Sequence, residues 1–316
     1  MKTPEIFDLA TQIGIDNDPR GRKRVGEELE KHERDYKELP EKKKKEYDLE
    51  KLTNPYADSG MHFVDSREIN RILAGIDIEP AEILLANQLA EQGRRIDLVI
   101  GHHPMGKALA TLSEVMEMQA DIWADQGIPE NIAEGILQDR MAQVTRRVAP
   151  ENHSRPVDAA KLLNIPLINI HTPADNCVWK YLDNYIKEKA PRTVGDIVES
   201  LKEIPEYFEA TKLNAGPVVF AGNERSRSGK IVIDMTGGTS ASEKIYEKLS
   251  QFGIGTIVTM HMAEQSREEA VKHFINVVIA GHYASDSLGM NLILDGIEKR
   301  GIEIIPCSGL IRHSRT

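Results

Sequence analysis

Apolar residues recur at helical spacing over residues 3–14, and a turn at 16–19 follows them. From residue 20 to residue 52 the chain is dominated by charged side chains, and Pro40 divides this segment into two helical pieces. The segment has too few apolar positions to build a core of its own. The pattern therefore predicts that residues 1–54 form a charged helical N-terminal extension or arm.

Alternation of short apolar runs with amphipathic segments begins near residue 71 and is typical of α/β structure. A long helical stretch, broken near Gly127 and Pro129, interrupts this alternation. We interpret residues 55–190 as a first α/β half with a helical insertion at about 108–150. Its expected strands cover 71–77, 96–100 and 166–170, and its expected helices cover 78–92, 108–148 and 156–163.

The same alternation returns over residues 191–316, which we interpret as a second α/β half. Helices are expected over 178–213, at the boundary between the halves, and a β-hairpin is expected from the apolar runs 217–221 and 230–235. A helix ending at residue 252, another before the strand at 276–280 and one more after residue 286 complete the expected helices. The remaining expected strands cover 256–259, 276–280 and 302–305.

The two halves repeat one order of elements and one chemistry at their strand ends. In the first half, a strand ending at Asp77 is followed by one leading to His102, and a later strand ends in His171-x-x-x-Asp175. In the second half the corresponding positions are Asp234, His261 and His282-x-x-x-Asp286. We infer two α/β halves related by approximate symmetry, with parallel-type strands covered by helices. Ligands collect beyond the carboxyl ends of such strands, where these residues fall.

Composition narrows the class of protein. A length of 316 residues exceeds the roughly 250–300 residues at which single cores stop growing, which favours two packed domains. No run approaches the roughly 18–20 apolar residues of a membrane span, and the N-terminus lacks an apolar signal region. Cys177 and Cys307 do not form a CxxC pair. We therefore expect a globular, cytoplasmic protein without a membrane partner.

A formal net charge of −10 argues against binding to nucleic acid, because phosphate contacts need clustered Lys and Arg. The single basic run, 42–45, lies between acidic residues and is interpreted as a solvated helix face.

Histidine and aspartate side chains at the strand ends predict a metal site. Imidazole and carboxylate without thiolate suit zinc, iron(II), manganese or cobalt better than calcium or magnesium. One catalytic zinc normally takes about three protein ligands, so a larger set fits two divalent ions. Two ions roughly 3.5–4 Å apart need a bridging carboxylate, for which Asp175 and Asp286 are the candidates. The expected ligands are His102, His103, Asp175, His282 and Asp286.

Three further features leave alternatives open. The loop Thr236, Gly237, Gly238 and Thr239, expected between a strand and a helix, could bind an anion through its amides or could be only a tight turn. His261 and Glu264 could act in proton transfer or beside the ligands. The residues Met116, Met118, Trp123 and Met141 recur at helical spacing, which favours core or subunit packing over a lid above the site.

Five motifs in this order resemble the Nif-three-like family (NGG-one-interacting factor three-like), whose members are often described as homologues of GTP cyclohydrolase I type 2. The resemblance spans about residues 55–316. The motifs are GHHP at 101–104, HTPAD at 171–175, DMTGGTS at 234–240, FGIGTIVTMHMAEQ at 252–265 and GHYASD at 281–286.

The resemblance implies an α/β protein of two similar domains with a dinuclear metal site between them, assembled as a homohexamer. It places the metal ligands on the same five residues, with His171 nearby. The chain departs from the family pattern in three places. Asp286 stands where Glu is usual, His261 stands where an acidic residue is more common, and the segment between His103 and His171 is longer than in short members.

Two functions are therefore expected as alternatives. The first is a metal-dependent hydrolase that uses zinc, iron or manganese to activate water against a small nucleotide or pterin-like substrate, with His171 or Glu264 moving protons. The second is a non-catalytic metal-binding protein with a regulatory or protein-interaction role. A cleft leading to an open coordination position would favour the hydrolase.

Overall fold

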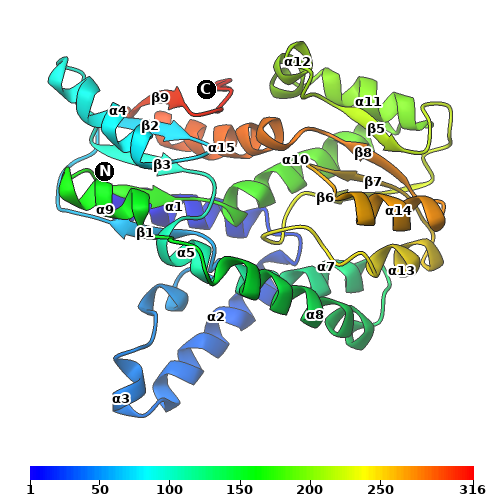
Figure 1. Ribbon diagram of the computed structural model, residues 1–316, viewed down its shortest axis with the longest axis horizontal. Coiled ribbons are helices and arrows are strands. Elements are labelled where there is room, and N and C mark those ends of the chain that lie inside the picture. Colours follow the sequence, from blue (N-terminus) through cyan, green and yellow to red (C-terminus); the bar gives the residue numbers. More distant parts are fainter.

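Two β-sheets, each covered by helices, lie side by side in the computed structural model, which describes residues 1–316 (Figure 1). The first sheet has the strand order β1-β4-β3-β2-β9 and the second has the order β5-β8-β7-β6. The first comprises β1 (Gly60–Phe63), β2 (Arg71–Gly75), β3 (Leu98–Gly101), β4 (Leu167–Asn169) and β9 (Glu303–Cys307). The second comprises β5 (Val218–Ala221), β6 (Lys230–Asp234), β7 (Ile254–Thr259) and β8 (Asn276–Ile279).

The two sheets repeat one arrangement, which confirms the predicted α/β fold of two similar halves. In each, an antiparallel edge strand pairs with the outermost of a set of parallel strands: β1 with β4 in the first sheet and β5 with β8 in the second. The first sheet has four parallel strands, because β9 is added beside β2, and the second sheet has three. Both antiparallel pairs also carry a shift of register. The carboxyl ends of β3 and β4, and of β7 and β8, therefore point the same way within each half.

The predicted hairpin of β5 with β6 is wrong. These two strands lie at opposite edges of the second sheet, because β5 pairs with β8 and β6 pairs with β7. The connecting loop contains a turn in which the amide of Ser226 donates to the carbonyl of Asn223, but this turn does not join paired strands. The loop binds instead to the start of the helical segment before it, where the amide of Ser228 donates to the carbonyl of Arg192 and Thr193 forms a bridge with Arg227.

Helices cover both faces of the first sheet. One core cluster joins Leu73 and Val99 to α4 and α9, and the other joins Ile72 and Ile100 to α1, α10 and α15. These helices span α4 (Pro80–Glu91), α9 (Arg155–Leu162), α1 (Thr3–Asp16), α10 (Thr172–Lys189) and α15 (His282–Glu298). The same α10 and α15 also pack on the second sheet, so this helix pair forms the seam between the halves (Figure 1).

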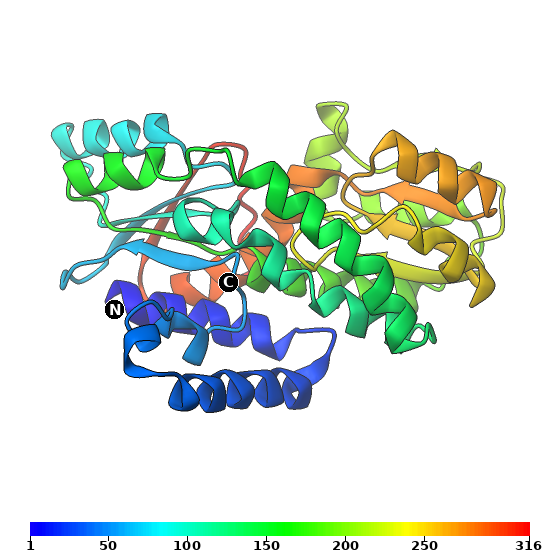
Figure 2. The ribbon, with the colours of Figure 1, turned by 60° about the horizontal axis from the view of Figure 1, so that its bottom comes forward.

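Two terminal segments pack where the sequence pattern did not place them. Helix α1, expected within the N-terminal extension, buries Ile6, Phe7 and Ala10 in the core of the first half. Strand β9, expected to end the second half, pairs with β2 in the first sheet. Beyond α1 the charged segment lies outside the cores (Figure 2). It contains α2 (Gly21–Glu38), α3 (Glu41–Lys44) and the short 3₁₀ helix η1 (Leu49–Leu52).

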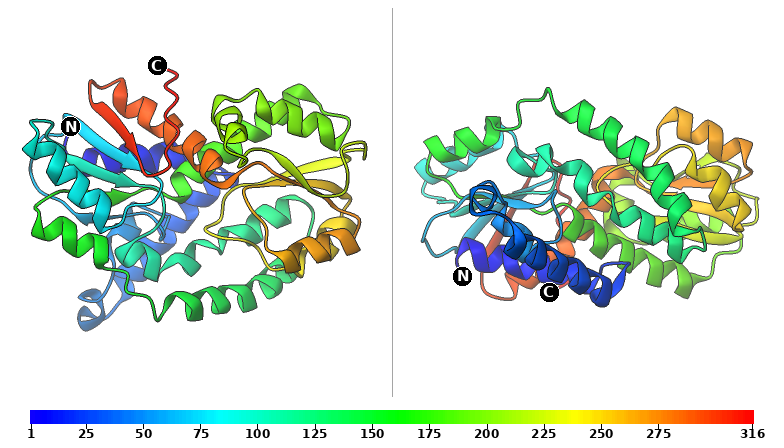
Figure 3. Two further views of the ribbon diagram at one scale, coloured as in Figure 1. Left: turned by 45° about the horizontal axis from the view of Figure 1, so that its top comes forward. Right: turned by 90° about the horizontal axis from the view of Figure 1, so that it is seen from below.

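The helical insertion crosses from the first half to cover the second sheet (Figure 3). Met116 and Trp123 are buried there beside Ile245 and Ile257, and Met118 packs with Tyr56. This is the core role that the sequence favoured for these residues; Met141 is only partly buried. The insertion contains α5 (Gly106–Ala110), α6 (Leu112–Val115), α7 (Met118–Asp125) and α8 (Glu130–Val148).

The remaining helices complete the cover of the second sheet. One face carries α11 (Val194–Lys202) and α12 (Pro205–Lys212), and the other carries α13 (Ile245–Gln251) and α14 (Glu264–Lys272). None of the helices is both long enough and apolar enough to cross a membrane.

Candidate metal centre

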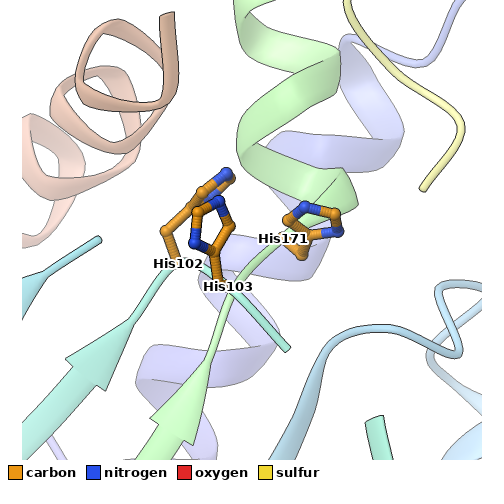
Figure 4. A group of neighbouring side chains, drawn as sticks. All are labelled: His102, His103 and His171. Carbon is orange, nitrogen blue, oxygen red and sulfur yellow. The ribbon is translucent and has the colours of Figure 1, made fainter. Parts of the chain in front are cut away.

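The beginnings of α10 and α15 meet the end of β3 at the junction of the two halves. His102 and His103 directly follow β3. Helix α10 carries Asp175 in its first turn, and α15 begins with His282 and carries Asp286 one turn later. His171 precedes the first residue of α10 (Figure 4). The two helices cross so closely that a Cβ on Gly289 would lie 2.3 Å from the backbone oxygen of Ala174. This crossing holds the two aspartates near the same histidines.

Asp286 lies at the centre of the cluster. His102 Nε2 lies 3.4 Å from Asp175 Oδ1 and 3.5 Å from Asp286 Oδ1. The other oxygen, Asp286 Oδ2, lies 3.5 Å from His103 Nε2 and 3.7 Å from His282 Nε2. Three groups have ligand atoms close enough to share an ion, and two of them contain Asp286: one has His102, Asp175 and Asp286, and the other has His103, His282 and Asp286.

Several atoms of the cluster are buried without any hydrogen-bond partner. They are His102 Nε2, Asp175 Oδ1 and both carboxylate oxygens of Asp286. Buried polar atoms in folded proteins are nearly always satisfied, so four orphans pointing at one another need an explanation. A divalent cation supplies it, because imidazole nitrogen and carboxylate oxygen are the donors that zinc, iron and manganese accept. The residues present therefore fit a metal ion.

Partners on the outer side of the histidines fix which nitrogen faces the cluster. The Nδ1–H of His102 donates to the carbonyl of Ile170 at 3.0 Å, and that of His103 donates to Asp77 Oδ1 at 2.7 Å. Since these oxygens can only accept, Nδ1 carries a proton, and Nε2 is the nitrogen left to bind a metal ion. Orientation of metal-binding imidazoles by a carbonyl or carboxylate is the usual arrangement in proteins.

His171 belongs to the same cluster more closely than the sequence indicated. Its Nδ1–H donates to Asp58 Oδ2 at 2.6 Å, and its Nε2 lies 3.8 Å from Asp175 Oδ2. Its ligand nitrogen is also near those of His102 and His103. Asp58 is fully buried and accepts a second hydrogen bond, from Thr172 Oγ1 at 2.7 Å. His171 can therefore serve as a further ligand or as a proton carrier beside the metal.

Burial and neighbouring charges shift the pKa values of the side chains in the cluster. Burial raises the pKa of Asp286, but the neighbouring His102 and His103 outweigh burial and hold it well below its usual range. Burial raises the pKa of Asp175 to about 6, against the opposing effect of His171. Burial lowers the pKa of His282 to about 4, so this imidazole is neutral and available as a ligand at neutral pH.

A cavity of about 300 Å³ opens onto the cluster. His103, His171, Asp175 and His282 line it from the metal side. The opposite wall comes from the second half, where Asp234 ends β6 and His261 follows β7. The ring of His261 lies 4.5 Å from that of His282. Substrate-sized space therefore reaches the side chains that would hold the metal.

The loop 236–239 also lines this cavity, but it is not the start of a helix. Helix α13 begins at Ile245, so the loop amides are not part of its first turn. Gln119 in α7 donates through Nε2 to the carbonyls of Gly237 at 2.6 Å and Thr239 at 2.7 Å. The structure places Glu264 outside the cavity, at the exposed start of α14, where it binds Arg267.

Two outer residues of the site were missed by the sequence reasoning. Asp77 was recognised only as a strand end and Asp58 was not singled out at all. Asp58 lies before β1, more than a hundred residues from His171 in the chain, and no local spacing links the two. Only the antiparallel pairing of β1 with β4, which sets Gly60 opposite Asn169, brings them together.

Replacing Asp77 with alanine is expected to weaken metal binding by about 10–100-fold, because His103 loses the acceptor that orients it. Isothermal titration of metal-free protein with zinc measures the change. Asp139→Ala is the matched control, since Asp139 is exposed and contacts only Lys244. Equal affinities of the Asp77 and Asp139 variants would show that Asp77 does not orient the ligand.

An α/β protein of two repeated halves, with an imidazole–carboxylate cluster at their seam, defines the class to which this chain belongs. It is similar in structure to a NIF3 superfamily protein from Sphaerobacter thermophilus, with 26% sequence identity and a TM-score of 0.75. That match covers 98% of this chain and 99% of the other. The chain therefore shares the fold of the NIF3, or Nif-three-like, superfamily.

A more distant match shares the fold alone. Reduced HcgD from Methanocaldococcus jannaschii has 14% identity and a TM-score of 0.50, over 78% of this chain and 88% of the other. No model of a known protein family matches the sequence, and no curated protein matches it. The high coverage of the Sphaerobacter match means that the charged helices and the insertion lie almost wholly within the matched region.

Proposed function

We propose that this protein binds two divalent metal ions and hydrolyses a small molecule in the cavity beside them. The observation that carries the proposal is the pair of ligand groups that share only Asp286, each of whose oxygens faces a different group. A single ion leaves one group unsatisfied. Two ions bridged by one carboxylate satisfy both groups and match the arrangement of two-metal hydrolases.

The open cavity supports hydrolysis over a purely structural role for the metals. A structural site is closed by protein ligands, whereas a catalytic site keeps a position open to water and substrate. Here His103, His171, Asp175 and His282 all border the cavity. A regulatory or protein-interaction protein without catalysis, the alternative from the sequence, has no comparable observation in its favour.

The position of each residue indicates whether it would bind metal or transfer a proton. His102, Asp175 and Asp286 would hold one ion, and His103, His282 and Asp286 would hold the other. When bound, the ions lower the pKa of water and polarise the bond to be broken. Asp58 holds the Nδ1 proton of His171, so its Nε2 is free to accept a proton from a water molecule in the cavity.

The size and lining of the cavity favour a small, uncharged or weakly charged substrate. A volume of about 300 Å³ lies at the lower end of the range for ligand sites. Lys and Arg are absent from its lining, so nothing on the protein side neutralises a triphosphate. A nucleobase-like or pterin-like ring fits these limits better than an intact nucleoside triphosphate. The proposal includes a cytoplasmic homohexamer, which light scattering tests directly.

Turnover by metal-loaded protein tests the proposal. Protein loaded with zinc, manganese or iron is assayed on GTP, pterins and a panel of phosphodiesters, beside Asp175→Ala and the exposed control Asp139→Ala. Loss of Asp175 is expected to reduce kcat/KM at least about 100-fold, because metal ions supply several kcal/mol of transition-state stabilisation. Metal-loaded protein that turns over none of these substrates, or turnover that survives Asp175→Ala, would contradict the proposed function.

A further inference from the structure

We propose that Asp234, on the cavity wall facing the metal cluster, is the catalytic acid that protonates the leaving group. The inference rests on the proposed function, and it assigns a step of that reaction to a residue outside the metal site. It replaces Glu264, the carboxylate that the sequence offered for this task.

The position of Asp234 in the fold directs it into the cavity. It is the last residue of β6 and pairs with Thr259 of β7, whose chain continues to His261. Asp234, Thr259 and His261 all line the cavity. The carboxyl group therefore stands on a strand end of the second half, while the metal ligands come from β3, α10 and α15. Substrate between the two walls meets the metals on one side and Asp234 on the other.

The side chain of Asp234 makes no hydrogen bond and no ion pair with any residue of the chain, although it is partly buried at the edge of the cavity. Burying a carboxyl group without a partner costs free energy, and nothing in the packing of β6 requires it. Burial alone raises the pKa of Asp234 to about 6. A carboxylic acid that is part protonated near neutral pH is suited to proton transfer.

None of the charged and titratable groups that face Asp234 accounts for its raised pKa, which burial alone causes. Tyr246 of α13 is close enough for the charge of Asp234 to raise its pKa, yet burial contributes more to that shift. His261 follows the adjacent strand, and burial lowers its pKa, so it is neutral. Across the cavity stand His103, His171, Asp175 and His282.

The loop after Asp234 is fixed to the metal side of the cavity. Thr236 Oγ1 donates to Asn176 Oδ1 at 2.6 Å, and Asn176 is the neighbour of Asp175 in α10. Gln119 holds the carbonyls of Gly237 and Thr239 from the insertion. Because one helix carries both a metal ligand and the anchor of this loop, the distance between the two walls is set by the fold. Such rigidity is what a catalytic group needs.

The step balances without any further reactant. The oxygen of a water molecule forms a bond to the carbon or phosphorus under attack, and the bond from that atom to the leaving oxygen or nitrogen breaks. The leaving atom keeps the electron pair of the broken bond and takes the proton of the Asp234 carboxyl group. One proton of the water passes to His171 Nε2 and the other remains with the product acid. Loss of the His171 proton to solvent and uptake of one proton from solvent by the Asp234 carboxylate restore both groups for the next turnover.

Two phosphodiesters with different leaving groups test this role. p-Nitrophenolate leaves without a proton, so hydrolysis of bis(p-nitrophenyl) phosphate needs no acid. The alkoxide that leaves a dinucleotide needs one. D234N is expected to lower kcat/KM by about 10²–10⁴-fold on the dinucleotide and by less than about 10-fold on the aryl ester. It should also remove the fall in activity of the wild type above pH about 6.

The controls separate a catalytic role from a structural one. E264Q, which removes the carboxylate that lies outside the cavity, is expected to retain wild-type activity on both esters. D234E is expected to recover part of the activity on the dinucleotide. Metal content, measured by elemental analysis, should be the same in wild type, D234N and D234E, because Asp234 is not among the groups that can hold an ion.

Stability provides a readout that does not depend on turnover. The pKa of Asp234 is raised in the folded state, so its protonation stabilises the fold at low pH, and this stabilisation is lost as pH rises through about 6. The urea midpoint of wild type should therefore fall more than that of D234N between pH 4.5 and pH 7.5.

The outcomes distinguish the two proposals. Wild-type protein that hydrolyses neither ester nor any compound of the wider panel defeats the proposed function, and the role of Asp234 fails with it. If wild type is active but D234N loses the same activity on both esters, or loses none, only the role of Asp234 is overturned. An equal pH dependence of the urea midpoint in wild type and D234N also overturns it.

Discussion

Asp286→Ala is expected to abolish binding of both metal ions, with an affinity at least about 100-fold below that of the wild type. Asp286 is fully buried, and each of its oxygens faces a different group of ligands. Removal of an outer partner of a metal ligand already costs about 10–100-fold, so loss of the shared ligand should cost more. Elemental analysis of protein loaded with zinc and passed through a desalting column gives the number of ions per chain.

The metal-dependent gain in stability should vanish in the same variant. A ligand present at 100 times its Kd stabilises the folded state by about 2.7 kcal/mol, which raises the Tm of wild type but not that of Asp286→Ala. Asp139→Ala serves as the control because its side chain is exposed. Retention of two ions by Asp286→Ala would remove this residue from the centre of the site. Asp286→Glu, which restores the residue usual in the family, is expected to bind both ions.

Gly289→Ala is expected to destabilise the protein by about 1–3 kcal/mol and to weaken metal binding at the same time. Gly289 lies where α15 crosses α10, and an added Cβ would lie 2.3 Å from the backbone oxygen of Ala174 and 2.8 Å from its carbonyl carbon. The helices must separate to admit a methyl group. Asp175 follows Ala174, and Asp286 lies one turn before Gly289. Separation of the two helices would therefore move these two carboxylates apart. Urea unfolding and zinc titration measure the two effects.

Gly135→Ala is the matched control for this substitution. Gly135 lies within α8, and a Cβ there meets no atom within 4 Å. Alanine is favoured over glycine inside a helix by up to about 1 kcal/mol, so this variant should be as stable as wild type or more stable. If Gly289→Ala behaved like Gly135→Ala, the close crossing would not be what holds the two aspartates together.

The local pattern of apolar and polar residues was sufficient to predict the ends of individual strands and the repeat of the two halves. Apolar runs followed by His102, His171 and His282 marked the strand ends, because parallel strands place their carboxyl ends at one edge of a sheet. The repeat of the two halves was visible for the same reason, since both sheets use one order of strands and helices. The structure accordingly brings the five expected ligand residues into one cluster.

Features that depend on distant pairing were not visible in the sequence. The apolar run of β9 does not indicate whether this strand pairs with β2 in the first sheet or with a strand of the second, because an apolar strand can pack at the edge of either sheet. The hairpin prediction failed because two neighbouring strands at hairpin spacing can also be separated by two others. Asp58 accepts a hydrogen bond from His171, and Asp234 lines the cavity opposite the metal cluster. Both placements depend on how distant segments pack, which the local sequence does not indicate.

Anomalous scattering from a crystal of the zinc-loaded protein tests the central claim most directly. Two bound ions bridged by Asp286 predict two anomalous peaks per chain, about 3.5–4 Å apart, with one carboxylate oxygen of Asp286 toward each. His102 and Asp175 should complete one ion's ligands, and His103 and His282 should complete the other's. A single peak, or two peaks that do not share Asp286, would contradict the account.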